Sequence, residues 1–423
     1  MGIARVSKSV YHPYKQYEDG QYGAAAVQVW GWDGSSRYRT ERLTYEILSD
    51  YCESLAVRYS QDNGASFSEF ELVSKENPRQ GGFEREDSWF AVCYDWRRGH
   101  DVRFDFQRVF VGTGPEALAE YWHGVESFFD HGLYCVSRDK GRTFSAPRLL
   151  KFEAGDDFDE KDWGKAGYLK KNKMYGGYTA IVTRGEKLLY PFTTVTKIQT
   201  ATSEQVTSVT RCMIGTWDEW TGDYQWEVSN EIAVPLAWSG RGCMEPTLAE
   251  LKDGRVVMGI RGSTDVSKLF CPEGKVKVTQ PGRHWLTVSE DGGYHWGPVR
   301  DWRYADGESF YSPSTFSRLL RHSNGKLYWI GNICPAPPVG NMPRHPLVIA
   351  AVDESGPGLV KDSVTVIDTK GEHEQVAAEF QLSNFYILEN EMTKVIELYL
   401  TRFGESPEHW LKANVYRYEI GVW

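Results

Sequence analysis

A short motif, Ser-x-Asp-x-Gly-x-x-aromatic, occurs three times in the chain and limits what it can fold into. The copies begin at Ser60, Ser137 and Ser289, and a run of residues that favour β-strand precedes each of them. An Asp side chain accepts hydrogen bonds from nearby backbone N–H groups, and Gly adopts a positive φ without strain. Each copy therefore predicts a hairpin turn that the aromatic side chain closes over an apolar layer.

The motif is regularly spaced. The first two copies are 77 residues apart, and the third follows after 152 residues, which is twice 76. A degenerate copy lies midway at 216–222, and fainter hairpin patterns follow at 352–356 and 401–404. Six repeats of a multi-strand unit predict an all-β fold, a six-bladed β-propeller of four-stranded antiparallel blades. The N-terminal strand is expected to close the first or the last blade, and a β-sandwich with coincidental Asp-Gly turns is the alternative fold.

The bulk properties restrict the class of protein. The repeats extend over residues 1–423, so a single domain is expected. A net charge of −10 argues against a nucleic-acid partner, although a few converging Arg residues would still form a local positive site. No apolar run reaches about 18 residues and the N-terminus has no apolar leader, which predicts no membrane partner and a cytoplasmic location unless a leader was removed. None of these properties predicts an oligomeric state.

The cysteines do not form a recognisable framework. There are seven, an odd number, and they are scattered with no Cys-x-x-Cys pair. This pattern predicts buried free thiols rather than disulfides or a zinc site. No metal ion or other cofactor is expected.

The repeated turns resemble the Asp-box repeats of the sialidase (neuraminidase) superfamily, whose catalytic domain is a six-bladed β-propeller. The resemblance covers nearly the whole chain in blade order. It implies an exo-acting glycoside hydrolase that removes a terminal acidic sugar from a glycan, with carbohydrate as its partner. Aromatic residues, at 14% of the chain, suit both blade packing and sugar stacking.

The strongest candidate site is a hairpin around the turn at 252–255. Glu245 begins its first strand and Arg261 ends its second strand, so both are expected at the same edge. The pair resembles the sialidase blade in which a Glu-Pro sequence begins a strand and an Arg follows sixteen residues later. The resemblance implies that Glu245 is a general base or nucleophile and that Arg261 binds the substrate carboxylate. Asp50, ten residues before the first motif, resembles the family's general acid.

Two further arginines match the family in order. Arg5 in the first strand and Arg344 in a Pro-rich loop correspond to the remaining carboxylate ligands of sialidases, and an Arg fork suits a carboxylate. The family's Tyr nucleophile is replaced, because Leu382 occupies its place. Tyr311, one blade earlier, is the candidate that Glu245 could activate instead.

Two other functions fit the same residues. One is a propeller that binds glycans or proteins without catalysis. The other is a related propeller enzyme that acts on another acidic or deoxy sugar by hydrolysis or elimination. The sequence does not discriminate among sugars, since the loops that would select one match no pattern.

Overall fold

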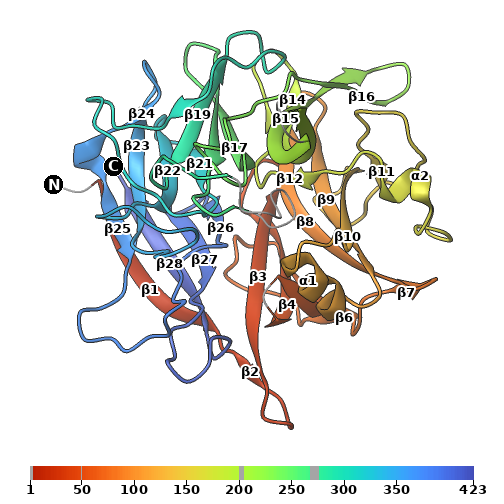
Figure 1. Ribbon diagram of the computed structural model, residues 1–423, viewed down its shortest axis with the longest axis horizontal. Coiled ribbons are helices and arrows are strands. Elements are labelled where there is room, and N and C mark those ends of the chain that lie inside the picture. Colours follow the sequence, from red (N-terminus) through yellow and green to blue (C-terminus); the bar gives the residue numbers. More distant parts are fainter. Residues whose placement is uncertain (1–2, 49, 200–203, 267–275) are drawn as a thin grey trace. The chain divides into compact units, whose positions relative to one another are not determined.

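The structure of the protein is a computed structural model, and it describes residues 3–48, 50–199, 204–266 and 276–423 (Figure 1). Its strands form six small antiparallel sheets in the arrangement of a six-bladed β-propeller, which confirms the predicted fold. The chain divides into two compact units. Unit 1 comprises Met1–Asn77, Arg303–Thr315 and Leu320–Trp423, and unit 2 comprises Pro78–Trp302 and Phe316–Leu319. The single domain expected for residues 1–423 stays a prediction.

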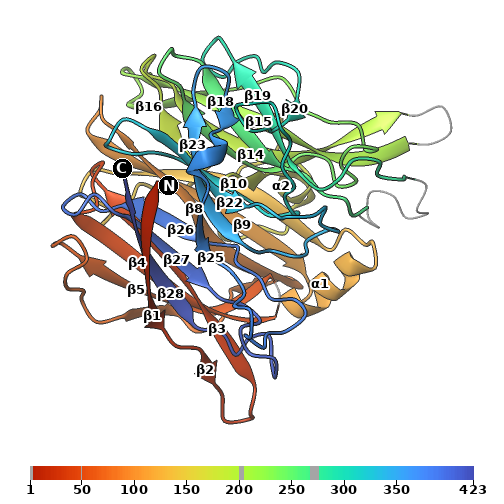
Figure 2. The same cartoon turned by 90° about the vertical axis from the view of Figure 1, so that its left-hand side faces the viewer.

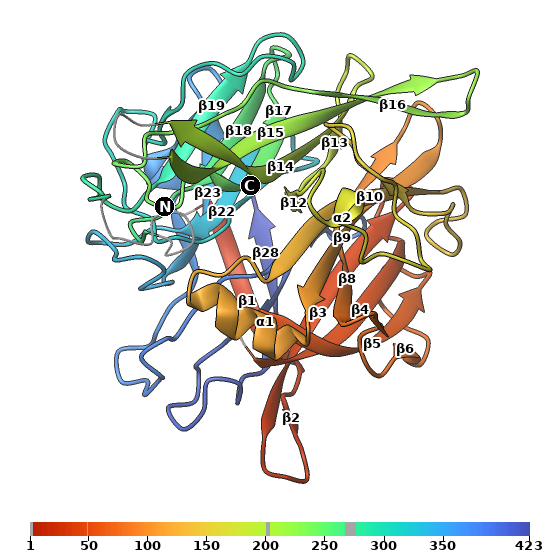
Figure 3. The ribbon, with the colours of Figure 1, turned by 45° about the vertical axis from the view of Figure 1, so that its right-hand side comes forward.

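Unit 2 contains the second, third and fourth blades. Blade 2 consists of β7 (Arg79–Gln80), β8 (Phe83–Asp95), β9 (His100–Val111), β10 (Phe128–Ser137) and β11 (Arg148–Leu149). Blade 3 consists of β12 (Tyr175–Gly176), β13 (Ile181–Val182), β14 (Leu188–Gln199), β15 (Glu204–Asp218) and β16 (Asp223–Val228). Blade 4 consists of β17 (Met244–Glu250), β18 (Val256–Arg261), β19 (His284–Ser289) and β20 (Arg300–Asp301). Two helices, α1 (Gly114–Trp122) and α2 (Ala166–Leu169), also lie in this unit, and Figure 3 shows α1 beside β9 and β10.

Unit 1 contains the remaining blades, apart from the first two residues of β21. Blade 1 consists of β2 (Lys15–Gln16), β3 (Tyr22–Trp32), β4 (Tyr38–Leu48), β5 (Tyr51–Ser60) and β6 (Glu71–Ser74). Blade 5 consists of β21 (Arg318–Arg321), β22 (Leu327–Asn332), β23 (Leu347–Asp353), β24 (Gly358–Leu359) and β25 (Thr365–Asp368), with the short 3₁₀ helix η1 (Lys361–Ser363). Blade 6 consists of β26 (Tyr386–Glu389), β27 (Ile396–Thr401), β28 (Val415–Val422) and β1 (Ala4–His12).

The three predicted turns have the same geometry. Each joins the last two strands of its blade, and in each the Ser hydroxyl donates to the Asp carboxylate at 2.8–3.0 Å. The motif Gly donates its backbone N–H to that Ser hydroxyl at 2.8–2.9 Å, and its φ lies between +74° and +100°. A side chain at this Gly would be strained in that backbone conformation. The Ser, Asp and Gly of the motif are thus explained by one hydrogen-bonded turn.

Asp291 gives a direct test of this structural role. Its carboxylate accepts hydrogen bonds from the Ser289 hydroxyl, the His295 backbone and the His295 ring, at 2.6–2.9 Å. Replacement of Asp291 by alanine is expected to lower the free energy of unfolding by about 1 kcal/mol, since such bonds contribute roughly that amount. Thermal denaturation measures this change. Glycan affinity of the folded variant should be unchanged, and a loss of affinity without a loss of stability would contradict a structural role.

Blade 6 is closed by the N-terminal strand. β1 pairs with β28 in an antiparallel register from Ala4↔Val422 to Val10↔Tyr416, and Figure 2 shows the two strands together. This confirms that the N-terminal strand closes a terminal blade and identifies it as the last. Because the fourth strand of this blade precedes the others in sequence, no hairpin can join it to the third. The pattern at 401–404 therefore lies between the second and third strands, β27 and β28, unlike the other repeats.

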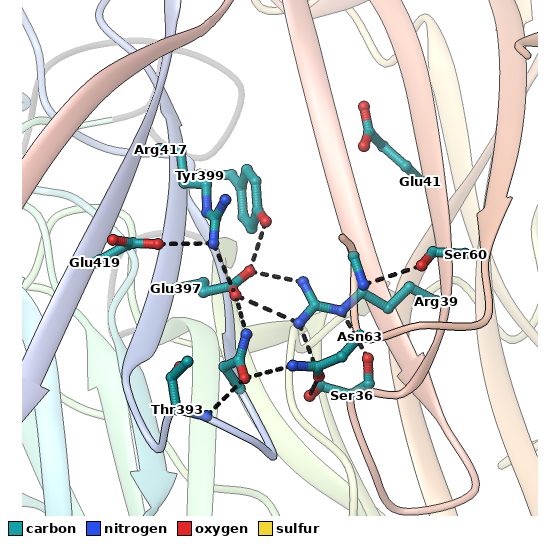
Figure 4. A network of polar contacts seen from close by, with 12 residues as sticks. Ser36, Arg39, Glu41, Ser60, Asn63, Thr393, Glu397, Tyr399, Arg417 and Glu419 are labelled. Carbon is teal, nitrogen blue, oxygen red and sulfur yellow. Dashed lines mark hydrogen bonds and ion pairs between the residues drawn. The ribbon is translucent and has the colours of Figure 1, made fainter. Parts of the chain in front are cut away.

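A buried ion pair connects blades 1 and 6 within unit 1 (Figure 4). Arg39 of β4 and Glu397 of β27 approach to 2.7 Å, and their side chains are 1% and 0% exposed. Glu397 also accepts hydrogen bonds from Asn390, Tyr399 and Arg417, at 2.6–3.0 Å. Burial alone would raise the pKa of Glu397, but Arg39 and the hydrogen bonds outweigh it and hold the pKa below its usual value. The carboxylate is therefore charged and fully satisfied inside the molecule.

Apolar contacts between neighbouring blades supply the remaining core. In unit 2, Leu189 and Ile214 of blade 3 pack with Met258, Ile260 and other residues of blade 4. Six cysteines of the described residues are free thiols, five of them buried, and Cys271 lies outside the described part of the chain. Among those residues, no helix combines the length and apolar character that crossing a membrane requires.

Candidate functional site

Glu245 and Arg261 form an ion pair at one edge of blade 4. The β17–β18 hairpin pairs Met244 with Arg261, so that the Glu245 carboxylate and the Arg261 guanidinium meet at 2.7 Å. Their side chains are 12% and 10% exposed. The hairpin thus brings these two sequence-predicted residues together at the predicted edge. Salt only weakly screens the attraction between two charges that are this deeply buried.

The backbone at Glu245 is unusual. Its φ is +44°, a value that few residues other than glycine adopt, and Pro246 follows it. The pairing of β17 with β18 is irregular between Met244 and Thr247, as in a β-bulge, a feature that redirects a side chain. Thr193 of blade 3 secures the position by accepting the Glu245 N–H at 3.0 Å. Left-handed backbone in a non-glycine residue costs about 1–3 kcal/mol and occurs preferentially at functional sites.

His284 lies beside this pair and is fully buried. It pairs with Arg261 across β18 and β19, and its Nδ1 is 3.2 Å from the Ile260 carbonyl oxygen. Burial, reinforced by the charge of Arg261, lowers the pKa of His284 to about 4. The imidazole is therefore neutral near pH 7, and no second cation lies against Arg261 from this position.

The lowered pKa predicts acid sensitivity. The native protein binds this proton less readily than the unfolded chain, whose His pKa is about 6.5, so stability is intact above pH 6.5 and falls toward pH 4. Between pH 7 and pH 4.5, His284 should contribute a loss of about 2–3 kcal/mol. Urea denaturation at both pH values is expected to show a smaller loss in His284→Gln than in the unmodified protein. Equal losses in the two proteins would refute the assignment.

Asp87 in β8 is a candidate that the sequence did not reveal. Its carboxylate accepts hydrogen bonds from Arg85 and Gln107, both at 3.0 Å. The surrounding protein atoms desolvate the carboxyl and raise the pKa of Asp87 above its usual value, an effect that is reduced because 45% of the side chain is exposed to water. A carboxyl group with a raised pKa is suited to general acid catalysis. The sequence contains one signal that could have indicated this site. Residues 84–87, at the start of β8, are all charged.

Arg318 is a second candidate functional residue that the sequence did not reveal. It is 6% exposed, and its guanidinium carbon lies 5.3 Å from the centre of the Tyr178 ring. Tyr178 also stacks on Phe90 and donates or accepts a hydrogen bond with the Tyr175 hydroxyl at 2.8 Å. Strand β8 and the segment that follows β12 thus present aromatic side chains beside a buried cation in unit 2. No local pattern marks such a contact between distant segments.

Arg344 lies in unit 1, in the loop between β22 and β23. Its guanidinium donates to the side chains of Gln381 and Ser383 and to the Ser314 carbonyl oxygen. The backbone of Leu382 donates to the Arg344 carbonyl at 2.9 Å, and the Leu382 side chain is fully buried. The start of blade 6 therefore lies against Arg344. The side chain at the expected Tyr position is part of the core.

The other predicted residues of unit 1 lie in separate elements. Asp50 is exposed in the turn between β4 and β5, with a φ of +65° and its N–H donating to Glu46 at 3.2 Å. Tyr311 precedes β21, is partly buried, and its backbone carbonyl accepts a hydrogen bond from Cys334. Arg5 is exposed on β1, the edge strand of blade 6. In a propeller the edge strand at this position is the one farthest from the axis.

The described residues contain no group of three or more His, Cys, Asp or Glu side chains that could hold a metal ion. The acidic and basic side chains of the site instead pair with one another.

Comparisons with known proteins identify the fold. No protein-family model matches the chain, and no curated protein does. Among solved structures, a protein of unknown function from Dyadobacter fermentans aligns with a TM-score of 0.59 and 13% identity over 99% of both chains. A mutant of the NanB sialidase from Streptococcus pneumoniae gives 0.56 and 12%, over 97% of this chain and 70% of that one. The intramolecular trans-sialidase from Ruminococcus gnavus gives 0.53 and 11%, over 98% and 96%. The chain thus has the six-bladed β-propeller fold that these sialidases have.

Proposed function

We propose that the protein is a glycoside hydrolase that acts on a terminal acidic sugar of a glycan, with Glu245 and Arg261 at the centre of its site. The observation that carries this proposal is the sheltered 2.7 Å ion pair, held by a strained backbone at Glu245. Strain of this kind opposes folding, and it is retained more readily where a side chain must point in one direction. The similar sialidase structures support carbohydrate as the substrate class.

The two side chains have distinct roles in this proposal. Arg261 binds the carboxylate of the sugar, because a guanidinium fork matches a carboxylate with two parallel hydrogen bonds. Glu245 is the general base or the nucleophile at the sugar carbon. The hydrogen bond from the Glu245 N–H to Thr193 and the ion pair with Arg261 fix its carboxylate before substrate arrives. Such fixed geometry reduces the entropy that binding would otherwise cost.

The remaining roles rest on position in the sequence. Asp50 is proposed as the general acid, Arg344 as a further carboxylate ligand and Tyr311 as a side chain that Glu245 could activate. Arg5 is left out, since it is exposed on an edge strand. Asp87, with its raised pKa, is the alternative general acid within unit 2.

A second function is favoured by Leu382. Leucine has no hydroxyl, and sialidases carry a Tyr nucleophile at this position. The Leu382 side chain is instead buried in the core. A propeller that binds acidic glycans without cleaving them would keep Arg261 and would need no nucleophile. Incubation with acidic oligosaccharides separates the two functions, because only the hydrolase releases free sugar.

Binding of acidic against neutral sugars tests the proposal. In Arg261→Ala, affinity for an acidic monosaccharide such as sialic acid should fall by about two to three decades, since losing one partner of a buried charge contact typically costs about 2–5 kcal/mol. Isothermal titration calorimetry measures this. Arg255→Ala, which removes a more exposed Arg paired with Asp253 in the same hairpin, should bind normally. If the unmodified protein binds an uncharged analogue equally well, the carboxylate-binding role of Arg261 is wrong.

A further inference from the structure

Trp238 lies exposed in the connection between β16 and β17. Its side chain is 39% exposed, and one face stacks on Trp285 of β19 with ring centres 5.6 Å apart and planes inclined by 16°. Trp285 is 2% exposed. The buried ring therefore supports the exposed one. An indole that remains open to water in this way forgoes the stabilisation that full burial would bring.

Hydrogen bonds hold the Trp238 loop in place. The Trp238 N–H donates to the Pro235 carbonyl at 2.8 Å, and the Thr279 N–H donates to the Ala237 carbonyl at 2.7 Å. The Ser239 hydroxyl donates to the Gly242 carbonyl at 2.6 Å and accepts the Ser263 N–H at 2.9 Å. The orientation of the indole is thus set before any ligand arrives.

The stacked pair adjoins the strand end that carries Arg261. Trp285 pairs with Ile260, the residue before Arg261, across β18 and β19. At Gly262, the residue after Arg261, a Cβ atom would approach the Trp285 indole nitrogen to 2.5 Å. Only glycine leaves that space for the ring. Ser263 then ties the Trp238 loop to the same segment.

We propose that Trp238 is a stacking platform for a neutral pyranose, the sugar unit next to the acidic one in the glycan. This inference rests on the proposed function, since it assigns a subsite to the same substrate. The C–H groups on one face of a pyranose carry partial positive charge and match the negative face of an indole. The platform is one ring wide, flat and rigid, and a rigid contact costs little ordering entropy on binding.

Trp220 provides a matched comparison. It is 95% exposed at the turn between β15 and β16, also in unit 2, and no aromatic ring among the described residues packs against it. Exposure alone therefore does not distinguish Trp238. Two features do: the support from Trp285, and the link through β19 and residues 262–263 to the strand end that carries Arg261.

Neutral disaccharides test the platform directly. Lactose, cellobiose and maltose are titrated against the protein by saturation-transfer NMR and calorimetry. At least one should bind, and its affinity should fall about tenfold or more in Trp238→Ala, because the stacking face is gone. Trp238→Phe, which keeps an aromatic face, should retain most of the affinity, and Trp220→Ala should retain all of it. Unchanged binding in Trp238→Ala, or no binding of the three disaccharides to the unmodified protein, would overturn the platform.

A second comparison separates this inference from the proposed function. Arg261→Ala should keep its affinity for the neutral disaccharide while losing affinity for sialic acid. With sialyllactose as substrate, Trp238→Ala should raise KM about tenfold and leave kcat unchanged. With a methyl sialoside, which lacks the neutral sugar, both KM and kcat should be the same in the variant and in the unmodified protein. Disaccharide binding at Trp238 without any turnover would support the platform and overturn the hydrolase. Turnover with a KM unaffected by Trp238→Ala would support the hydrolase and overturn the platform.

Discussion

Replacement of Glu397 by glutamine is expected to lower the free energy of unfolding by about 3–5 kcal/mol, because it leaves the buried Arg39 charge without its partner. Glutamine keeps the shape of the side chain, so the change creates no cavity. Tyr399 and Asn390 retain a side chain to bond with, which isolates the loss of charge as the cause. Urea and thermal denaturation measure the effect.

A nearby carboxylate serves as the control. Glu419 bonds to Arg417, the same arginine that contacts Glu397, but its side chain is 48% exposed. Glu419→Gln should change stability by less than about 1 kcal/mol, as exposed ion pairs usually do. Similar effects from the two substitutions would show that burial does not determine the strength of this network.

Replacement of Glu245 by glutamine is expected to lower kcat/KM for an acidic glycoside by about 10²–10⁴-fold, the usual contribution of a positioned acid, base or nucleophile. The loss should be similar for a natural glycan and for an activated aryl glycoside, because both require attack at the sugar carbon. Glu250→Gln, at the other end of β17, is the control and should retain activity. Steady-state kinetics with the two substrates decide the outcome.

The two substrates also identify the general acid. An aryl leaving group needs little protonation, so loss of the acid should impair the natural glycan far more than the aryl glycoside. Asp50→Asn and Asp87→Asn are compared in this way, and only one of them should show the selective loss. Full activity in Glu245→Gln on both substrates would remove the hydrolase proposal and leave glycan binding as the function.

The sequence predicted the fold because its repeats are local. Ser60, Asp62 and Gly64 form a turn among themselves, and the spacing of such turns was enough to predict six blades. Likewise, Glu245 and Arg261 meet because a short hairpin connects them. Their catalytic roles stay predictions.

The sequence could not reveal contacts between distant segments. Nothing near Arg39 in the chain indicates Glu397, and nothing near Trp238 indicates Trp285. The binding role predicted for Arg5 came from the order of residues along the chain, and that order did not indicate that Arg5 lies on an edge strand. Order in the sequence did not specify which strand of a blade would carry the residue.

The pairing of β1 with β28 has a consequence for biosynthesis. Residues 4–12 leave the ribosome some 400 positions before their partners at 415–422. During that interval β1 has no strand to pair with, and contacts between such distant residues form slowly. A strand that has no pairing partner can form hydrogen bonds with an exposed strand edge of another nascent chain. Of its nine residues, five are classed as exposed and they include Arg5 and Lys8, whose charges discourage such pairing until translation has delivered β28.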